Sequence, residues 1–289
     1  MKLMFNGTAA SEGFPAVFCE CKYCRKAKEL GGKNIRTRSS CLINEEYLID
    51  FPPDTYMHTL YGSLKLSNVK HVIITHHHKD HFAPDDLFRS YPPFAYPDEN
   101  SILHIYGNEM VYEKYKQAAE GYMTAHAEKH LKFILVYQSK WFAAGLVNIL
   151  PLKADHGRPN ENCFIYIINV DDKNLLYGHD TGYFPSEIWD TLEALKDFKL
   201  DGVILDCTNG NQLILDVTSE KSGYESYHMG VFTNIKVRER LLELGIADEE
   251  TVFIITHFSH NTNPIYDDIA KIAEENGFIA AYDGMRIEI

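Results

Sequence analysis

The sequence predicts an α/β fold in which strands and helices alternate along the chain. Two observations carry this prediction. Short apolar runs rich in β-branched residues recur between residues 41 and 256, and amphipathic helical stretches lie between them. Runs of this length and composition are typical of strands. Because strands dominate both halves of the chain, we expect a layered α/β domain and not a purely parallel wound sheet.

Each predicted strand is a short apolar run bounded by polar or turn-forming residues. The runs are 41–51, 71–75, 102–107, 132–137, 146–152, 164–170, 174–178, 202–206 and 251–256. The segment from Asp171 to Asn174 joins two of them and has the composition of a tight turn, which predicts a hairpin.

Helical patterns fill the intervals between these runs. The stretch 185–198 begins with Pro185 and Ser186, while 233–245 and 263–277 both end at a glycine, as many helices do. The stretch 108–131 fits one or two helices. We find no linker and no repeat, so we expect one domain over residues 1–289, with a helical insertion around 92–131 left open.

The charge balance limits the partners. The formal net charge is −13, which argues against long nucleic acids, because their binding depends on Lys and Arg at the phosphates. A small anionic substrate remains compatible if bound cations supply positive charge. No apolar run approaches the ~18 residues of a membrane span, and the N-terminus lacks a long apolar stretch typical of a signal peptide. We therefore expect a cytoplasmic protein that does not associate with a membrane. Whether the chain forms a homodimer is left open.

The segment ITHHHKDHF, from Ile74 to Phe82, predicts a metal site. In an extended segment His76 and His78 point to the same side and can share one ion, whereas His77 points away. Asp80 and His81 follow a turn and can reach a second ion. Imidazole and carboxylate ligands suit Zn²⁺, Mn²⁺ or Fe²⁺.

Further polar residues follow the ends of other predicted strands. His156 follows the run 146–152, Asp180 follows 174–178, and His257 follows 251–256. Rigid strands that deliver polar side chains to one edge of a sheet are a common way to build a site. We expect these residues to meet the 76–81 segment there.

The H-x-H-x-D-H pattern at 76–81 resembles the signature of the metallo-β-lactamase superfamily, and Asp50, His156, Asp180 and His257 stand in that family's order. The resemblance implies a four-layer αβ/βα sandwich with the site at one edge of two facing sheets. It implies one ion on His76, His78 and His156, a second on Asp80, His81 and His257, and Asp180 as the bridge. It also implies that Asp50 orients these ligands without binding the ions itself.

Three cysteines near the N-terminus form a C-x-C-x₂-C cluster, Cys19, Cys21 and Cys24. Three thiolates need a fourth ligand to close a tetrahedral zinc site, and His260 is the preferred candidate. The opening NGTAASEGFPAVFCECKYC resembles the phosphoribosyl 1,2-cyclic phosphate phosphodiesterase (PhnP) group. That resemblance implies one structural zinc on these four residues. The isolated Cys41, Cys163 and Cys207 are expected to be small buried hydrophobes.

The resemblance implies a dinuclear metal-dependent hydrolase that cleaves a cyclic or activated phosphodiester. The expected substrate is a phosphoribosyl 1,2-cyclic phosphate or a 2′,3′-cyclic nucleotide. The expected cofactors are two Mn or Zn ions, with Fe as an alternative, which lower the pKa of a bridging water so that hydroxide attacks phosphorus. Asp80 is assigned to catalysis as well as to metal binding. His228, in SYHMG, matches a catalytic position of the group and is the candidate proton donor to the leaving group.

Other functions of the same fold stay open: a tRNA 3′-processing-like nuclease, a lactonase or thioesterase, and an iron oxygenase that resembles PqqB. The CECKYC segment speaks against the lactonase and the thioesterase, and the nuclease is disfavoured because the sequence shows no RNA-binding arm. A non-catalytic binder is disfavoured, because buried unpaired carboxylates and imidazoles are costly without a metal.

Overall fold

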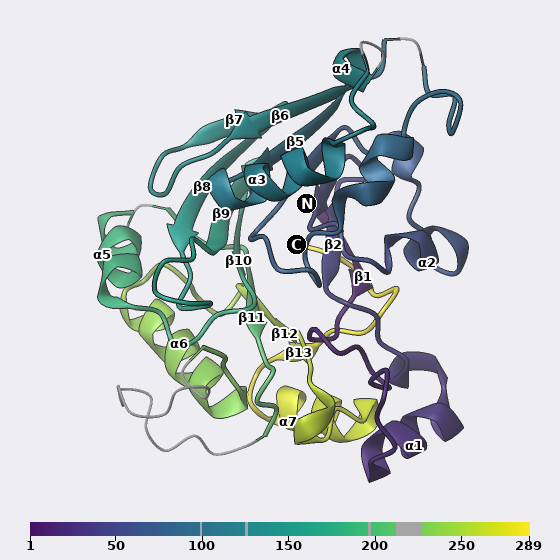
Figure 1. Cartoon of the computed structure of the whole chain (residues 1–289). Coiled ribbons are helices and arrows are strands. Elements are labelled where there is room, and N and C mark those ends of the chain that lie inside the picture. Colours follow the sequence, from purple (N-terminus) through teal and green to yellow (C-terminus); the bar gives the residue numbers. More distant parts are fainter. Residues whose placement is uncertain (99, 125–126, 196–197, 212–226) are drawn as a thin grey trace.

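The computed structural model describes residues 1–98, 100–124, 127–195, 198–211 and 227–289 (Figure 1). Two seven-stranded sheets form its centre. The first has the order β14 (Arg286–Glu288), β1 (Lys2–Gly7), β2 (Ser40–Ile43), β3 (Tyr47–Ile49), β4 (His71–Ile73), β5 (Leu103–Gly107) and β6 (Leu131–Leu135). The second has the order β13 (Ile279–Ala280), β12 (Val252–Thr256), β11 (Gly202–Asp206), β10 (Lys173–Gly178), β9 (Phe164–Val170), β8 (Val147–Lys153) and β7 (Phe142–Ala144).

Helices cover the outer face of each sheet (Figure 1). The described helices are α1 (Lys22–Leu30), α2 (Thr55–Leu60), α3 (Glu109–Ala119), α4 (Ala127–His130), α5 (Ser186–Ala194), α6 (Val231–Glu243) and α7 (Tyr266–Glu275). Short 3₁₀ turns occur at Gly32–Asn34, Leu66–Asn68, Pro84–Arg89 and His260–Thr262. In the described part of the chain no helix is long and apolar enough to cross a membrane.

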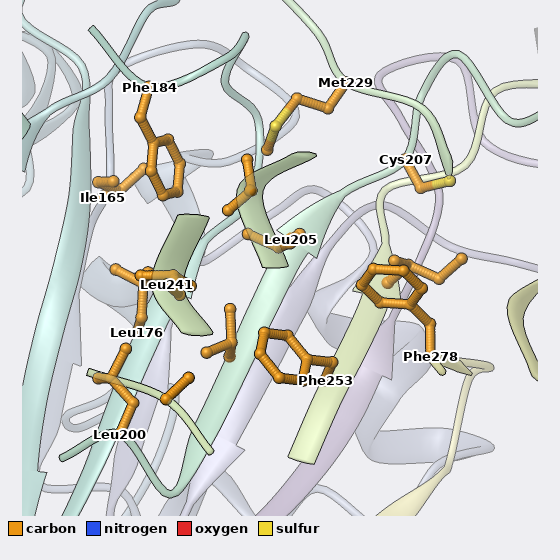
Figure 2. Close-up of a cluster of buried hydrophobic side chains, with 14 of the residues drawn as sticks. Ile165, Leu176, Phe184, Leu200, Leu205, Cys207, Met229, Leu241, Phe253 and Phe278 are labelled. Atoms are coloured by element: carbon orange, nitrogen blue, oxygen red, sulfur yellow. The ribbon is translucent and has the colours of Figure 1, made fainter. Parts of the chain in front are cut away.

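Three buried apolar layers hold the sheets and helices together. Between the sheets, Ile49 and Ile73 of the first pack with Tyr166 and Ile204 of the second. Outside the first sheet, Val111 of α3 joins the core that includes β3 and β4. Outside the second sheet a larger cluster forms, and Figure 2 shows Leu176 and Leu205 of the sheet together with Leu241 of α6. This helix–sheet–sheet–helix order confirms the predicted four-layer α/β sandwich.

The predicted runs all form strands, but the sequence analysis missed β1, β7, β13 and β14 and misjudged one run. The run 41–51 is not one strand but a hairpin of β2 and β3, because Asn44 and Glu45 take positive φ of 47° and 64° and turn the chain back. The predicted hairpin of β9 and β10 is present, with Asp171 and Asp172 at its turn. The segment 92–131 contains α3 and α4 and also supplies β5 to the first sheet.

The sheets place many strand ends at one edge. β3 and β4 are parallel, and β10, β11 and β12 are parallel to one another. β8 runs in the same direction as β10, because both are antiparallel to β9. The carboxyl ends of β8, β10, β11 and β12 therefore lie along one edge, and the polar residues that follow these strands are brought together there.

Candidate metal centre

The candidate ligands leave their strands through turned backbone. Asp50 follows β3, Asp180 follows β10 and His257 follows β12, and their φ angles are 61°, 53° and 64°. A side chain other than glycine pays on the order of 1 kcal/mol for this left-handed conformation. The positive φ ends the alternation of side chains between the two sheet faces at the point where each ligand leaves its strand.

The 76–81 segment folds into a tight turn after β4. The amide N–H groups of His81 and Phe82 both donate to the carbonyl oxygen of His78, at 3.1 and 2.8 Å. The N–H of Phe51 in turn donates to the carbonyl of His81 at 2.8 Å. This turn brings Asp80 and His81 back beside His76, as the spacing of the motif predicts.

One group of four ligand atoms comes from His76, His78, His156 and Asp180, all within 4.8 Å of one another. The Nδ1 atom of His78 lies 3.0 Å from Nε2 of His76 and 3.2 Å from Nε2 of His156. Both of these Nε2 atoms lie 3.3 Å from Oδ2 of Asp180. A tetrahedral site with bonds of ~2.0–2.1 Å has edges of ~3.3 Å. The four atoms therefore have the spacing that one divalent ion requires.

A second group shares a residue with the first. It comprises Asp80, His81, Asp180 and His257, again within 4.8 Å. Nε2 of His81 lies 3.3 Å from Oδ2 of Asp80 and 3.0 Å from Oδ2 of Asp180. Nε2 of His257 lies 3.8 Å from the same Asp180 oxygen. Asp180 thus stands between both groups, in the place predicted for a bridge, while His77 lies outside them.

Two buried ligand nitrogens make no hydrogen bond within the described residues. Carboxylate oxygens lie near Nε2 of His81 and Nε2 of His257, but neither nitrogen forms a hydrogen bond with them or with any other described group. Leaving such an atom unpaired costs about 1–3 kcal/mol. Cations within the two groups would satisfy both nitrogens, so the residues fit a pair of divalent ions. The fold implies divalent metal binding, and the choice of metal stays a prediction.

The pKa values of the ligand histidines shift in opposite directions in the two groups. Burial lowers the pKa of His156 to about 4 and that of His76 well below its ordinary value, so both imidazoles are neutral. Burial also lowers the pKa of His81, but Asp80 and Asp50 outweigh it and raise the pKa well above the ordinary value. Since a ligand imidazole must be neutral, cation binding at His81 releases a proton.

Buried side chains fix the ligand histidines from behind. Oδ2 of Asp50 lies 2.7 Å from Nδ1 of His81, and Asp50 also accepts a 2.8 Å hydrogen bond from the N–H of Thr75. Thr75 Oγ1 is 3.0 Å from Nδ1 of His76. This is the geometry expected of an orienting carboxylate. His179 is buried as well, and its Nε2 atom lies 3.4 Å from Oδ2 of Asp50.

Asp206, the last residue of β11, is a further functional candidate. Its buried carboxylate lies 3.2 Å from Nδ1 of His257 and 3.3 Å from Nδ1 of His228. Nδ1 of His228 is also 3.3 Å from Oδ1 of Asp180. Burial lowers the pKa of His228, but Asp206 outweighs it and raises the pKa to about 9. The structure therefore brings the predicted proton donor to the metal groups; residues 212–226, which precede it, lie outside the described residues.

The cysteine cluster meets His260 as predicted. Sγ of Cys19 and of Cys21 lie 3.4 and 3.7 Å from Nδ1 of His260, and all four side chains offer ligand atoms within 4.8 Å. Cys21 caps α1 and accepts a 3.4 Å hydrogen bond from the N–H of Cys24, which brings these two thiols to one side. Edges of ~3.6–3.8 Å are those of a tetrahedral zinc site with thiolate and imidazole ligands.

The thiols also carry an electrostatic signature of a cation site. Burial opposes ionisation of Cys21, yet His260 and the amide of Cys24 lower its pKa to about 6. Burial raises the pKa of Cys24 to about 12, and the neighbouring thiols add to that shift. Three adjacent thiols cannot all ionise without a positive charge among them. The four residues fit a zinc ion, and its identity stays a prediction.

The two centres share one loop. Phe258, between His257 and Ser259, donates its N–H to the carbonyl of Thr8 at 2.9 Å and accepts from the N–H of Ala10 at 3.0 Å. The buried guanidinium of Arg36 lies 4.4 Å from the centre of the Phe258 ring. Phe258 therefore ties the loop that carries both His257 and His260 to the N-terminal segment.

Comparison with known proteins agrees with this geometry. A family model described as a beta-lactamase superfamily domain matches residues 47–258. A curated octanoyltransferase of Porphyromonas gingivalis (strain ATCC BAA-308 / W83) is 27% identical over 165 residues, which are 55% of this chain and 31% of that protein. The chain thus spans about a third of the length of that relative.

Three solved structures share the fold across the whole chain. A new diphosphatase from the PhnP family has 19% identity and a TM-score of 0.72, covering 100% of this chain and 97% of that one. Zn²⁺-bound PqqB from Methylobacterium extorquens has 18% identity and a TM-score of 0.72, covering 100% of both. The short form of human tRNase Z has 17% identity and a TM-score of 0.65, covering 100% and 99%. The predicted superfamily and the likeness to the PhnP group are confirmed.

Removing the imidazole of His260 should release one zinc ion per chain. We expect His260→Ala to lower the zinc content by one ion and to lower the melting temperature by several degrees, because the loop loses its anchor. The catalytic ions should at first be retained. Elemental analysis and thermal unfolding measure both effects. His104→Ala, at a half-buried histidine outside both centres, is the control, and equal zinc contents for the two variants would contradict the assignment.

Loss of the Asp80 carboxylate should empty the second group selectively. We expect Asp80→Ala to bind one catalytic ion fewer and to lose most of its hydrolytic activity, because His81 and His257 then share only Asp180 as an anionic ligand. The circular dichroism spectrum should be unchanged. Metal titration by calorimetry counts the ions, and an unaltered stoichiometry would show that Asp80 is no ligand.

Proposed function

The chain belongs to the β-lactamase superfamily and has its hydrolase fold, and on this premise we propose that it hydrolyses a cyclic or activated phosphodiester of a small molecule. Phosphoribosyl 1,2-cyclic phosphate is the leading substrate, and 2′,3′-cyclic nucleotides come second. The single observation that carries the proposal is that two four-residue ligand groups share Asp180. Such a pair of groups can hold two ions on either side of one phosphoryl group.

A second feature supports the phosphodiester class. The Cys19, Cys21, Cys24 and His260 cluster accompanies the catalytic groups, as the resemblance to the PhnP group implies. One structural neighbour is described as a diphosphatase of that family, which supports a phosphorus-containing substrate. The proposal includes Mn or Zn as catalytic ions, one structural Zn, and a cytoplasmic location.

The chain supplies ligands, a proton donor and a dry environment. When bound, two divalent ions supply an acidified water for attack on phosphorus and balance the charge of the phosphoryl oxygens. His76, His81 and His257 are buried, so these three ligands are themselves shielded from bulk water. His228 has a quarter of its side chain exposed, so it faces the open side from which a substrate would enter.

His228 is suited to protonate the leaving oxygen. Asp206 holds its Nδ1 at 3.3 Å, which leaves Nε2 as the nitrogen available to a substrate. The same carboxylate lies 3.2 Å from His257. Asp206 can therefore fix His228, the proton donor, relative to His257, a candidate metal ligand. The leaving oxygen and the ions would then keep a fixed relative position.

A second candidate function is hydrolysis of a fatty acyl ester or thioester. It is favoured by one observation, the match to an octanoyltransferase over 55% of this chain. The same ligand groups would serve ester cleavage, since polarisation of a carbonyl needs the same ions.

A substrate panel separates these functions. We expect bis(p-nitrophenyl) phosphate and at least one small cyclic phosphate to be hydrolysed with Mn²⁺ or Zn²⁺. Octanoyl thioester, a lactone and a tRNA precursor should be at least tenfold poorer, and oxygen consumption with Fe²⁺ should be absent. Hydrolysis of the thioester without any phosphodiester would favour the second candidate and overturn the first.

Replacing the proton donor should slow the reaction without removing the ions. We expect His228→Asn to lower kcat by 10²–10⁴-fold on a substrate with a poor leaving group. The loss should be much smaller for p-nitrophenolate, which leaves without a proton. Metal content should equal that of the wild type. Equal losses on both substrates would contradict the role in protonation.

A further inference from the structure

His78 presents its nitrogens in the opposite way to the other ligand histidines of its group. His76 and His156 turn Nε2 toward the shared cluster, whereas His78 turns Nδ1 toward it. The remaining nitrogen of His78, Nε2, therefore points away from the ion position. It lies 3.2 Å from Oε2 of Glu161, a residue that the sequence motifs do not single out.

Glu161 is held in place by its own loop. This loop joins β8 to β9, and residues 158 to 161 form a turn in which the N–H of Glu161 donates to the carbonyl of Arg158 at 2.8 Å. The N–H of Arg158 donates back to Oε2 of Glu161 at 2.9 Å. The Glu161 side chain is only 13% exposed. A carboxylate fixed by these contacts is a ready acceptor for an imidazole N–H.

Gly157 makes room for this carboxylate. Its φ is +76°, and a Cβ atom at this position would lie 2.4 Å from Oε2 of Glu161 and 3.1 Å from Cβ of Glu161. Heavy atoms do not approach so closely, so any side chain at 157 must displace Glu161. Glycine is therefore favoured at position 157 for two reasons: the backbone has a positive φ, and Glu161 occupies the space that a side chain would need.

We propose that Glu161 is the positioning residue for His78. Its carboxylate accepts the Nε2–H hydrogen of His78 and fixes the tautomer whose Nδ1 lone pair faces the first ion. A carboxylate behind a ligand imidazole orients the ring and makes it more basic. The inference rests on the first ligand group of the proposed function and deepens it.

The proposal makes the short loop after β8 a functional unit. His156 at its start belongs to the first ligand group, and Glu161 near its end holds His78, another member of that group. Gly157 lies between them. Two of the three imidazoles of the first group therefore depend on the conformation of this loop.

Titration with Co²⁺ tests the proposal without reference to activity, on protein that has lost the catalytic ions and keeps the zinc of the Cys₃His cluster. Bound Co²⁺ reports its ligands through visible absorption, and competition with a chromophoric chelator gives the affinity. We expect Glu161→Ala to weaken the binding of one Co²⁺ ion by 10–100-fold. Glu161→Gln keeps a neutral acceptor and should weaken it less. Gly157→Ala should weaken it as Glu161→Ala does, although Glu161 itself is unchanged.

Two controls separate this effect from general damage. Gly245→Ala places a Cβ at a similar φ of +67° with no heavy atom within 4 Å, so it reports backbone strain alone. Glu187→Gln removes an exposed acidic charge elsewhere. Both should bind Co²⁺ like the wild type.

The proposal is overturned if Glu161→Ala binds both ions with wild-type affinity and an unchanged spectrum, or if Gly245→Ala weakens binding as much as Gly157→Ala. If Gly157→Ala does not fold, the Glu161→Ala and Glu161→Gln pair decides alone. A wild-type protein that cleaves no phosphodiester, combined with weakened Co²⁺ binding in Glu161→Ala, would overturn the proposed substrate class and support the role of Glu161.

Discussion

The carboxylate of Asp180 is the constraint on which the site depends. It is buried, and its Oδ2 atom lies within 3.0–3.3 Å of Nε2 atoms of three imidazoles, His76, His81 and His156. A buried carboxylate is stable only when positive charge or hydrogen bonds compensate for the lost water. Histidines alone supply that charge only by taking up protons, which would remove their lone pairs. Divalent cations supply it and leave the imidazoles neutral, so the arrangement favours metal binding over protonation.

Further carboxylates strengthen this preference. Asp50 and Asp206 are buried behind His81 and His257, and Asp80 lies beside His81. Burial opposes their ionisation, but the neighbouring histidines lower the pKa of Asp206 to about 2 and those of Asp50 and Asp80 further still. Four carboxylates around a few imidazoles leave an excess of negative charge. That excess attracts cations, and cations held there would supply the local positive charge that the proposed anionic substrate needs.

The sequence could predict the residues that a local pattern marks. The order of His76, His78, Asp80 and His81 after an apolar run indicated both the strand and its metal-binding turn. His156, Asp180 and His257 were found because they also follow strands and match a family order. This approach could not find Thr208 or Glu161. It also could not show that Asp206 contacts both His257 and His228. Their partners lie far away in sequence, and only the tertiary fold brings Thr208 within 2.7 Å of His257. The β2–β3 hairpin was missed because its turn, Asn44–Glu45, contains neither Gly nor Pro.

The two centres are coupled by the shortness of the loop between them. His257 and His260 are three residues apart, and the segment between them is fixed on both sides. Phe258 pairs with Thr8 and Ala10, and Ser259 donates to Oε1 of Glu12 at 2.5 Å. Arg36, buried against the Phe258 ring, donates to the carbonyl of Ala281 at 2.7 Å and ties the end of the chain to the same place. His257 takes a positive φ, which the loop must hold against the tendency of a non-glycine residue to relax. A zinc ion held by Cys19, Cys21, Cys24 and His260 would remove the freedom through which that relaxation occurs. The N-terminal cluster would then act on the metal-binding edge through backbone geometry, although its residues contribute no atom to either ligand group there.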